Sequence, residues 1–336
     1  AGAVFAVLIF CLLVFLLWVQ CFIIFSRDIS VAKFPEHFYQ LSMDEGRGFS
    51  EEYESLVSVG MEQTKAAALL PQNKPRNRFN NVLPYDWCRV KLSTLNPNEA
   101  SDYINACYMP GYKSDRDYIA TQGPLPATVS DFWRMIWEQR VKGIVMVTNC
   151  TEGGRTKCEQ YWPADRKPCS HGELSVSTRF EQKEPNWTLR EFRRHYSEER
   201  TVRHFHFTAW PDHGVPQGTG VLIQFRGLVR RHIEGEGAEA PTVVHCSAGV
   251  GRTGTIIALD VLLQQLERER AVGINAFVRK MRLSRPHMVQ TESQYVFLHQ
   301  CIMDCLQKDE EAEENIYENA EMIYTNATAL RELTRA

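Results

Sequence analysis

One ten-residue segment, residues 245–254, constrains the fold of this 336-residue chain more than any other. It reads His-Cys-Ser-Ala-Gly-Val-Gly-Arg-Thr-Gly and lies between two regular elements: residues 242–245 predict a buried strand, and residues 254–267 predict a helix. The small side chains let successive backbone N–H groups point inward, and the helix N-terminus adds its positive dipole. The segment therefore predicts an anion-binding cradle that begins at Cys246 and contains Arg252.

Cys246 and Arg252 indicate the chemistry of this cradle. The field that binds a phosphate dianion also favours a thiolate, and cysteines in such places have pKa values of about 3.5–7.5. The planar guanidinium of Arg252 can bind two phosphate oxygens. A thiolate beside a bound phosphorus atom predicts catalysis through a cysteinyl-phosphate, which needs no metal and no cofactor. The other predicted phosphate-binding and supporting residues of the loop are His245, Ser247, Ala248, Gly249, Val250, Gly251 and Thr253.

The same segment has two other interpretations. Residues 249–254 fit Gly-x-Gly-x-x-Gly, the pattern of dinucleotide-binding loops. That interpretation leaves the His-Cys start and the arginine unexplained, and no clear β-α-β unit surrounds the glycines. Cys246 could also be a small buried hydrophobe, as many cysteines are. The loop around Cys246 favours the catalytic interpretation over both.

A second loop, residues 210–216, contains one carboxylate between prolines and glycine (Trp-Pro-Asp-His-Gly-Val-Pro). A phenol has a pKa near 10, so a tyrosine leaving group needs a proton. Asp212 is the candidate general acid, a role that contributes about 10²–10⁴ in rate. Trp210 is the candidate anchor of a moving loop. Alone, the motif could be a structural turn; beside the cysteine loop, the acid role is the better interpretation.

The N-terminal segment, residues 1–25, has no charged side chain and one strongly polar one, Gln20. About 20 apolar residues suffice for a helix to span a bilayer. A signal peptide would have a basic start and a shorter apolar run, so we expect a transmembrane helix. Arg27 and Lys33 favour a cytoplasmic location for the rest of the chain, as in a single-pass type I protein of the plasma membrane. Because the chain begins Ala-Gly, we expect it to be a fragment without its outer part.

The rest of the chain divides into three predicted parts. Residues 26–50 are expected to form a juxtamembrane segment whose helical first part packs on the domain through Phe34, Phe38 and Leu41. Residues 51–306 carry mixed signals, including a strand over 143–148 and helices over 131–139 and 293–306. Residues 307–336 form an acidic tail. The net charge of −3 provides no global case for nucleic-acid binding, and the 10 scattered cysteines indicate reduced thiols.

The two loops together resemble those of a family, the classical protein tyrosine phosphatases. The resemblance extends over about residues 50–306, with the family's motifs in the same order. Residues 79–87 and 277–282 resemble in particular the receptor-type members that have one catalytic domain and a fibronectin-repeat ectodomain. The further motifs that carry it are 74–86 (KPRNRFNNVLPYD), 102–106 (DYINA), 120–124 (ATQGP), 157–163 (KCEQYWP) and 289–294 (VQTESQ).

The resemblance implies a fold and a set of roles. The fold would be α/β, with a central, highly twisted mixed sheet flanked by helices. Cys246 would be the nucleophile, Arg252 the phosphate-binding arginine and Asp212 the general acid. Gln290 would place the hydrolytic water, with Gln294 as its helper. The activity would be hydrolysis of phosphotyrosine in proteins.

Four more positions correspond to positions of the family, two of them with a different residue. Phe79 occupies the place of a tyrosine that stacks on the substrate ring, and a phenyl ring can still stack. Glu152 and Lys157 match a loop whose charges approach the arginine and the acid. Asn81 replaces an aspartate that accepts bonds from the substrate backbone, and an amide offers one neutral acceptor. Asn81 could instead be a turn residue without a ligand role.

Three alternatives concern function. A catalytically inactive phosphotyrosine-binding module would lack Asp212, Cys246 or Arg252, and all three are present. A lipid phosphatase would favour extra lysines in the cysteine loop, which has none. A zinc site formed by Cys158, Cys169 and His171 fits no standard spacing, so no metal is expected.

The acidic tail contains two Tyr-x-Asn motifs, at Tyr317 and Tyr324. Phosphorylation would add charge and acceptor oxygens that SH2 domains bind with arginines. We expect these tyrosines to recruit SH2-domain adaptors; the alternative is an inert solvated tail.

Overall fold

The computed structural model describes residues 28–93, 102–165, 167–196, 198–237 and 240–308. The apolar segment 1–25 and both tail tyrosines lie outside these ranges. Within them, no helix combines the length and the apolar character needed to cross a membrane.

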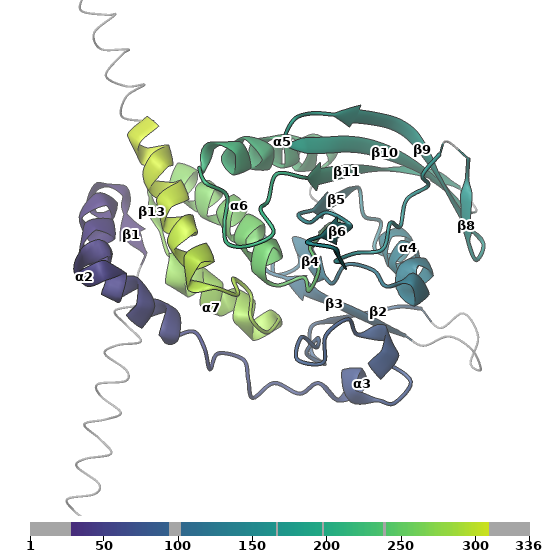
Figure 1. Cartoon of the computed structure of the whole chain (residues 1–336), viewed down its shortest axis with the longest axis horizontal. Coiled ribbons are helices and arrows are strands. Elements are labelled where there is room, and N and C mark those ends of the chain that lie inside the picture. The colour runs from purple at the N-terminus through teal and green to yellow at the C-terminus, as the bar shows by residue number, and fades with distance from the viewer. Residues whose placement is uncertain (1–27, 94–101, 166, 197, 238–239, 309–336) are drawn as a thin grey trace, which may run out of the picture.

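The centre of the structure is a nine-stranded sheet (Figure 1). Across it, the strands follow the order β2, β3, β4, β12, β5, β11, β10, β9, β8. The four central strands, β4, β12, β5 and β11, pair in parallel, and the outer pairs are antiparallel. The mixed sheet predicted from the resemblance is therefore confirmed. The strands are β2 (Arg89–Lys91), β3 (Tyr103–Met109), β4 (Tyr118–Thr121), β5 (Gly143–Met146), β8 (Cys169–His171), β9 (Leu174–Lys183), β10 (Trp187–His195), β11 (Glu199–Phe207) and β12 (Thr242–His245).

Helices cover both faces of this sheet, and two hydrophobic cores lie beneath them. Successive side chains of a strand point to opposite faces: Val243 of β12 packs in the core under α4, and Val244 packs in the core under α5 and α6. The α and 3-10 helices are η1 (Val31–Lys33), α2 (Phe34–Glu54), α3 (Ala66–Leu69), η2 (Lys74–Arg76), η3 (Pro126–Thr128), α4 (Val129–Glu138), α5 (Gly220–Glu236), α6 (Gly251–Glu269), α7 (Ile274–Ser284) and a last helix over residues 292–308.

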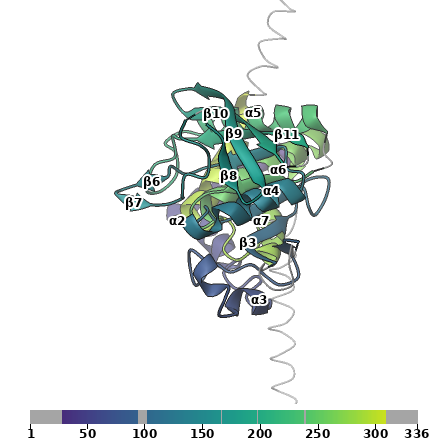
Figure 2. The ribbon, with the colours of Figure 1, turned by 90° about the vertical axis from the view of Figure 1, so that its right-hand side faces the viewer.

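Two small strand pairs lie outside the main sheet. The hairpin of β6 (Thr151–Glu152) and β7 (Arg155–Thr156) stands out from the body of the domain (Figure 2). The pair of β1 (Ile29–Ser30) and β13 (Ala271–Val272) attaches the start of the described chain to the end of α6. The sequence did not predict the second pair, because each strand has only two residues.

Helix α2 confirms that the segment before residue 50 packs on the domain, since Phe34 and Leu41 are buried. The helix contains a break at residues 43–46, where Asp44 has a φ of 50° and Gly46 a φ of 81°. It then continues to Glu54 and so crosses the boundary that the sequence placed at residues 50 and 51. The reason is that Phe49, beyond the break, belongs to the same core as Phe34.

The elements around the cysteine loop agree with the sequence to within a few residues. Strand β12 has the predicted bounds, and β5 ends at Met146, two residues before the predicted end. Helix α6 begins at Gly251 rather than at residue 254. Arg252 therefore belongs to the first turn of a helix, which fixes the direction of its side chain.

Candidate active site

Cys246 follows β12 directly and begins a loop whose carbonyl groups are held from outside. Arg285 donates from Nε to the carbonyl oxygen of Gly249 (2.9 Å) and from Nη2 to that of Ala248 (3.0 Å). The N–H of Gly123 donates to the carbonyl oxygen of Ser247 (2.9 Å). These bonds turn three successive carbonyls away from Cys246, and the N–H of Gly249 donates to its Sγ (3.3 Å). The loop is thus a cradle of donors, as a bound anion requires.

Gly249 is required by the backbone of this loop. Its φ is +73°, and a Cβ at this position would lie 2.1 Å from the carbonyl oxygen of Thr121. On the far side, the carbonyl oxygen of Val250 accepts from the N–H of Gly254 (2.9 Å) and from that of Val289 (3.1 Å). The loop is therefore tied to β4, to the first turn of α6 and to the segment before Gln290.

A chain of hydrogen bonds supports Cys246 from behind. His245 Nδ1 donates to the carbonyl oxygen of Cys246 (3.1 Å), so its Nε2 accepts the hydroxyl of Tyr161 (2.8 Å). The Tyr161 oxygen then accepts from His204 Nε2 (2.8 Å), and His204 Nδ1 accepts from Arg190 (3.4 Å). Burial lowers the pKa of His245 to about 4 and that of His204 well below its usual value. Both imidazoles are therefore neutral, and Arg190 Nη1 also donates to Nδ1 of His206 (3.2 Å).

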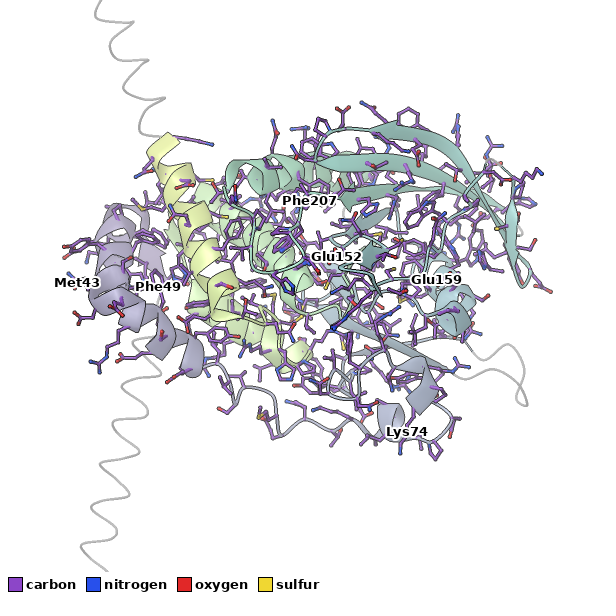
Figure 3. The ribbon with its side chains drawn as sticks, viewed as in Figure 1. Met43, Phe49, Lys74, Glu152, Glu159 and Phe207 are labelled. Atoms are coloured by element: carbon purple, nitrogen blue, oxygen red, sulfur yellow. The ribbon has the colours of Figure 1, made fainter. Side chains whose placement is uncertain are left out.

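Arg252 is held by a carboxylate in a two-point ion pair. Its Nη1 lies 2.7 Å from Oε1 of Glu152, and its Nη2 lies 2.9 Å from Oε2. Burial acts to raise the pKa of Glu152, but the hydrogen bond and charge of Arg252, together with hydrogen bonds from the N–H of Asn149 and the hydroxyl of Thr148, lower it overall. Arg252 Nη2 also donates to the carbonyl oxygens of Pro211 (3.0 Å) and Asp212 (3.3 Å). The arginine therefore connects the β6–β7 hairpin, where Figure 3 labels Glu152, to the loop of the candidate acid.

Asp212 is exposed, and Lys157 lies beside it. Lys157 Nζ is 3.3 Å from Asp212 Oδ1. Desolvation acts to raise the pKa of Asp212, but the hydrogen bond and charge of Lys157 act against it, and the net effect is a lowered pKa. Trp210 anchors the same loop: its ring is buried, its Nε1 donates to the carbonyl oxygen of Gly214 (3.1 Å), and Arg252 lies over its ring at 5.7 Å.

Gln290 occupies a loop whose backbone is held at several points. Gln294 Oε1 accepts from the N–H groups of Gln290 (2.9 Å) and Thr291 (3.3 Å). The hydroxyl of Tyr53, from α2, donates to the carbonyl oxygen of Gln290 (2.5 Å). Val289 has a φ of 58°, which is rare for a β-branched residue and is held here by its bond to the cysteine loop. The Gln290 side chain itself is exposed and free to face the site.

These residues surround a cavity of about 290 Å³. Cys246 is only 5% exposed at its base, and Phe79 is 41% exposed at its rim. The Phe79 loop is fixed by Arg78, which donates to the carbonyl oxygens of Gly123 (3.0 Å) and Pro124 (2.7 Å). The cavity is lined by Phe79, Asn81, Val82, Thr148, Glu152, Lys157, Cys246, Ser247, Ala248, Gly251, Arg252, Gln290 and Gln294.

The structure therefore brings most of the predicted site residues together at one cavity. Asp212 contacts Arg252 and Lys157, which line the cavity, and Trp210 packs against Arg252. His245 and Thr253 lie behind the cavity and are fully buried. Thr253 Oγ1 has no hydrogen-bond partner among the described residues. Sequence reasoning gave no role to Val82 and Thr148 on the wall, although Val82 lies in the motif 74–86. It also gave none to the supporting residues Tyr53, Tyr161, Arg190, His204 and Arg285, of which only Tyr161 lies in a quoted motif, 157–163.

Comparisons with known proteins agree with this geometry. The sequence model of the family described as Protein-tyrosine phosphatase matches residues 73–304. The chain is 50% identical over 311 residues to Receptor-type tyrosine-protein phosphatase H of Homo sapiens, covering 90% of this chain and 28% of that protein. It is 50% identical over 309 residues to Receptor-type tyrosine-protein phosphatase eta of Gallus gallus (91% and 21%). It is 42% identical over 310 residues to Phosphatidylinositol phosphatase PTPRQ of Homo sapiens (92% and 13%). The chain thus spans less than a third of these relatives.

Proposed function

We propose that this chain, which belongs to the protein-tyrosine phosphatase family, hydrolyses phosphotyrosine in proteins through a cysteinyl-phosphate on Cys246. One observation carries the proposal: Cys246, only 5% exposed, lines a cavity of about 290 Å³ beside the N–H of Gly249 and an arginine held in a fixed orientation by Glu152. The cradle suits a dianion, and the thiolate lies beneath the place that the phosphorus atom would take.

In the first step, the Cys246 thiolate attacks phosphorus, the S–P bond forms and the bond from phosphorus to the tyrosine oxygen breaks. The loop N–H groups and Arg252 bind the phosphoryl oxygens, whose charge they stabilise in the transition state. Asp212 gives its proton to the departing phenolate oxygen, and so a neutral phenol leaves. The bonds from Arg252 to the carbonyls of Pro211 and Asp212 hold the acid loop at the cavity while this occurs.

In the second step, a water attacks the phosphorus atom of the cysteinyl-phosphate. Gln290 places this water, and its backbone is held by Gln294 and Tyr53. The Asp212 carboxylate takes one proton from the water, the new P–O bond forms and the S–P bond breaks. The products are inorganic phosphate and the Cys246 thiolate, stabilised again by the cradle.

Selectivity for phosphotyrosine follows from the depth of the cavity. A phosphate on an aromatic ring reaches Cys246, while the ring packs against Phe79 at the rim. A phosphate on the short side chain of serine does not reach it. Asn81 lies exposed on the same rim, where its amide can accept a bond from the substrate backbone.

The test compares the wild-type chain with Cys246→Ser on three substrates: a phosphotyrosine peptide, the matched phosphoserine peptide and a phosphatidylinositol phosphate. We expect hydrolysis of the first alone, with loss of turnover in Cys246→Ser and retained tungstate binding by its cradle. Equal kcat/KM on phosphoserine would refute selectivity by depth. Preference for the inositol lipid would assign the site to the other substrate class named among the relatives.

We also propose that the chain is a receptor-type enzyme of the plasma membrane. The names of its relatives and the apolar segment 1–25 support this. In this arrangement the segment spans the membrane once, Arg27 and Lys33 lie after it on the cytoplasmic side, and the catalytic domain is cytoplasmic.

The tail beyond residue 308 is proposed to recruit SH2-domain adaptors once Tyr317 and Tyr324 are phosphorylated. The support is the repeated Tyr-x-Asn pattern after an acidic run, residues 309–314. A doubly phosphorylated peptide spanning residues 313–328 should bind such a domain with a Kd of about 1 μM. Replacing Asn319 and Asn326 with Ala should remove most of the affinity; unchanged binding would refute the adaptor assignment.

A further inference from the structure

His37, Glu52 and His299 form a cluster apart from the active-site cavity. Their ligand atoms lie within 4.8 Å of one another, and none of the three lines the cavity that contains Cys246. His37 and Glu52 come from the two halves of α2, on either side of its break, and His299 comes from the last helix. Phe49, labelled in Figure 3, packs between these helices with its ring 5.1 Å from that of His299.

We propose that this cluster is a zinc site that joins α2 to the last helix. Two imidazoles, one carboxylate and a water are the ligand set of many four-coordinate zinc sites. Glu52 Oε1 lies 3.8 Å from His37 Nε2, and Glu52 Oε2 lies 3.9 Å from His299 Nε2. These separations are too long for hydrogen bonds. With one ligand atom from each residue, the three atoms lie within 4.8 Å of one another, so binding would bring some of them closer, to the separation of about 3.3–3.6 Å around a tetrahedral zinc with bonds of about 2.0–2.2 Å.

The tautomer of His299 suits this role. Its Nδ1 lies 3.0 Å from the carbonyl oxygen of Tyr295, and a carbonyl can only accept, so the ring proton is on Nδ1. Nε2 therefore carries the lone pair, and it faces Glu52. Such a pairing, with a backbone carbonyl on one ring nitrogen and the metal on the other, is common among zinc-binding histidines and fixes the orientation of the ring. Burial lowers the pKa of His299 to about 3, so the ring is neutral.

Glu52 explains why a cation would be favoured here. Its side chain is buried, and His37 and His299 are the only basic side chains that the structure places within 4.0 Å of it in the described part of the chain. Desolvation raises its pKa, with the hydrogen bond from Tyr295 acting the other way. A zinc ion would neutralise the buried carboxylate by direct ligation. Asn275, 5% exposed, donates to Tyr295, while its Oδ1 has no partner among the described residues and offers a buried acceptor beside the cluster.

Bound zinc would attach helix α2 firmly to the catalytic domain. The first half of α2 comes directly after the segment that leads from residues 1–25, and zinc would fasten it to the end of the catalytic domain. Tyr53, next to Glu52, donates to the backbone of Gln290. The site would thus fix the helix from which the Gln290 loop is held.

The test measures metal binding directly, without relying on turnover. The whole chain, purified in detergent, is stripped with a chelator and titrated with Zn²⁺ in buffers of different ionisation enthalpy. All proteins carry Cys246→Ser, so that the reactive thiolate does not compete for metal. We expect one bound zinc and a higher Tm. Co²⁺ in place of zinc should give visible absorption without a thiolate charge-transfer band.

Matched variants locate the site. His37→Ala, Glu52→Gln and His299→Gln should each weaken zinc binding by about 100-fold or more, because each removes a ligand. His195→Ala, which removes an exposed histidine on β10, should bind zinc like the parent. His37 is 26% exposed, so its variant should fold as the parent does, which circular dichroism checks. Zinc binding by His37→Ala equal to the parent, or a thiolate band in the cobalt spectrum, would overturn the proposal. Phosphatase activity of the wild-type chain, with Cys246 intact, is measured in chelator and tests the proposed function separately.

Discussion

Lys157 Nζ lies 3.3 Å from Asp212 Oδ1, so the proposed general acid lies beside a positive charge. The charge favours the carboxylate, which the second step needs as a base, over the protonated form, which the first step needs as an acid. The pair therefore sets the upper pH limit at which the first step runs.

Replacing Lys157 with Met should move the alkaline limb of kcat/KM to higher pH. Asp212 has a lowered pKa because of Lys157, so removing the lysine raises that pKa and keeps the acid protonated to higher pH. The pH profile for a phosphotyrosine peptide measures this. Lys280→Met, which breaks an exposed ion pair with Asp115, is the control and should leave the profile unchanged. An unmoved limb in Lys157→Met would mean that another group limits the reaction.

Glu152→Gln should lower kcat/KM by about 10- to 100-fold. The change replaces one charge-assisted bond to Arg252 and frees the guanidinium to adopt other orientations, at a cost of about 1.5–3 kcal/mol. The value of kcat/KM and the affinity for tungstate should both decrease, since both depend on Arg252. Glu234→Gln, on the exposed face of α5, serves as the matched control. Activity equal to wild type would show that the loop alone orients Arg252.

Tyr161→Phe should destabilise the domain by about 1–3 kcal/mol, because it leaves His245 Nε2 and the His204 N–H buried without their partner. Expressed as free energy, the loss of kcat/KM should be smaller than the loss of stability, since Arg285 still holds the cysteine loop. Urea unfolding measures the first quantity. Tyr39→Phe, at an exposed position, should change neither. Unchanged stability in Tyr161→Phe would contradict the tautomers assigned here.

The free energy of unfolding should fall as the pH drops from 6.5 toward 4. Burial lowers the pKa of His206 and of His245 to about 4. Such groups stabilise the fold above their unfolded pKa of about 6.5, and this stability is lost as the pH falls toward the folded value. Each contributes at most about 1.4 kcal/mol per pH unit. Denaturant titrations at several pH values test this, and His206→Gln should flatten the slope. If His206→Gln leaves the pH dependence of the unfolding free energy unchanged, His206 does not contribute to it.

The sequence predicted the elements that carry local patterns. Strand β12, the loop from Cys246 and helix α6 form one continuous segment, so residue types and spacing located all three, although α6 begins at Gly251 and not at the predicted residue 254. The apolar run over residues 143–148 predicted β5 for the same reason. The positions of Glu152 and Lys157 came only from the family resemblance, because nothing local shows that a short hairpin lies beside Arg252 and Asp212.

The supporting residues could not be predicted because they act across long stretches of chain. Arg285 contacts a loop 36 residues before it, and Tyr161 contacts His245 across 84 residues. Their bonds depend on how the sheet orders its strands, which local periodicity does not specify. The break in α2 is a similar case: Asp44 adopts a positive φ because Phe34 and Phe49 must both reach one core.

The most direct measurement of the central claim is the identification of the covalent intermediate. The chain is mixed rapidly with a phosphotyrosine peptide, quenched in acid, digested and analysed by mass spectrometry. We expect one phosphoryl group on Cys246, present in greater amount in Gln290→Ala, where the attacking water is no longer placed, and absent in Cys246→Ser. Continued turnover with no phosphoryl group on Cys246, or with the group on another residue, would contradict the account.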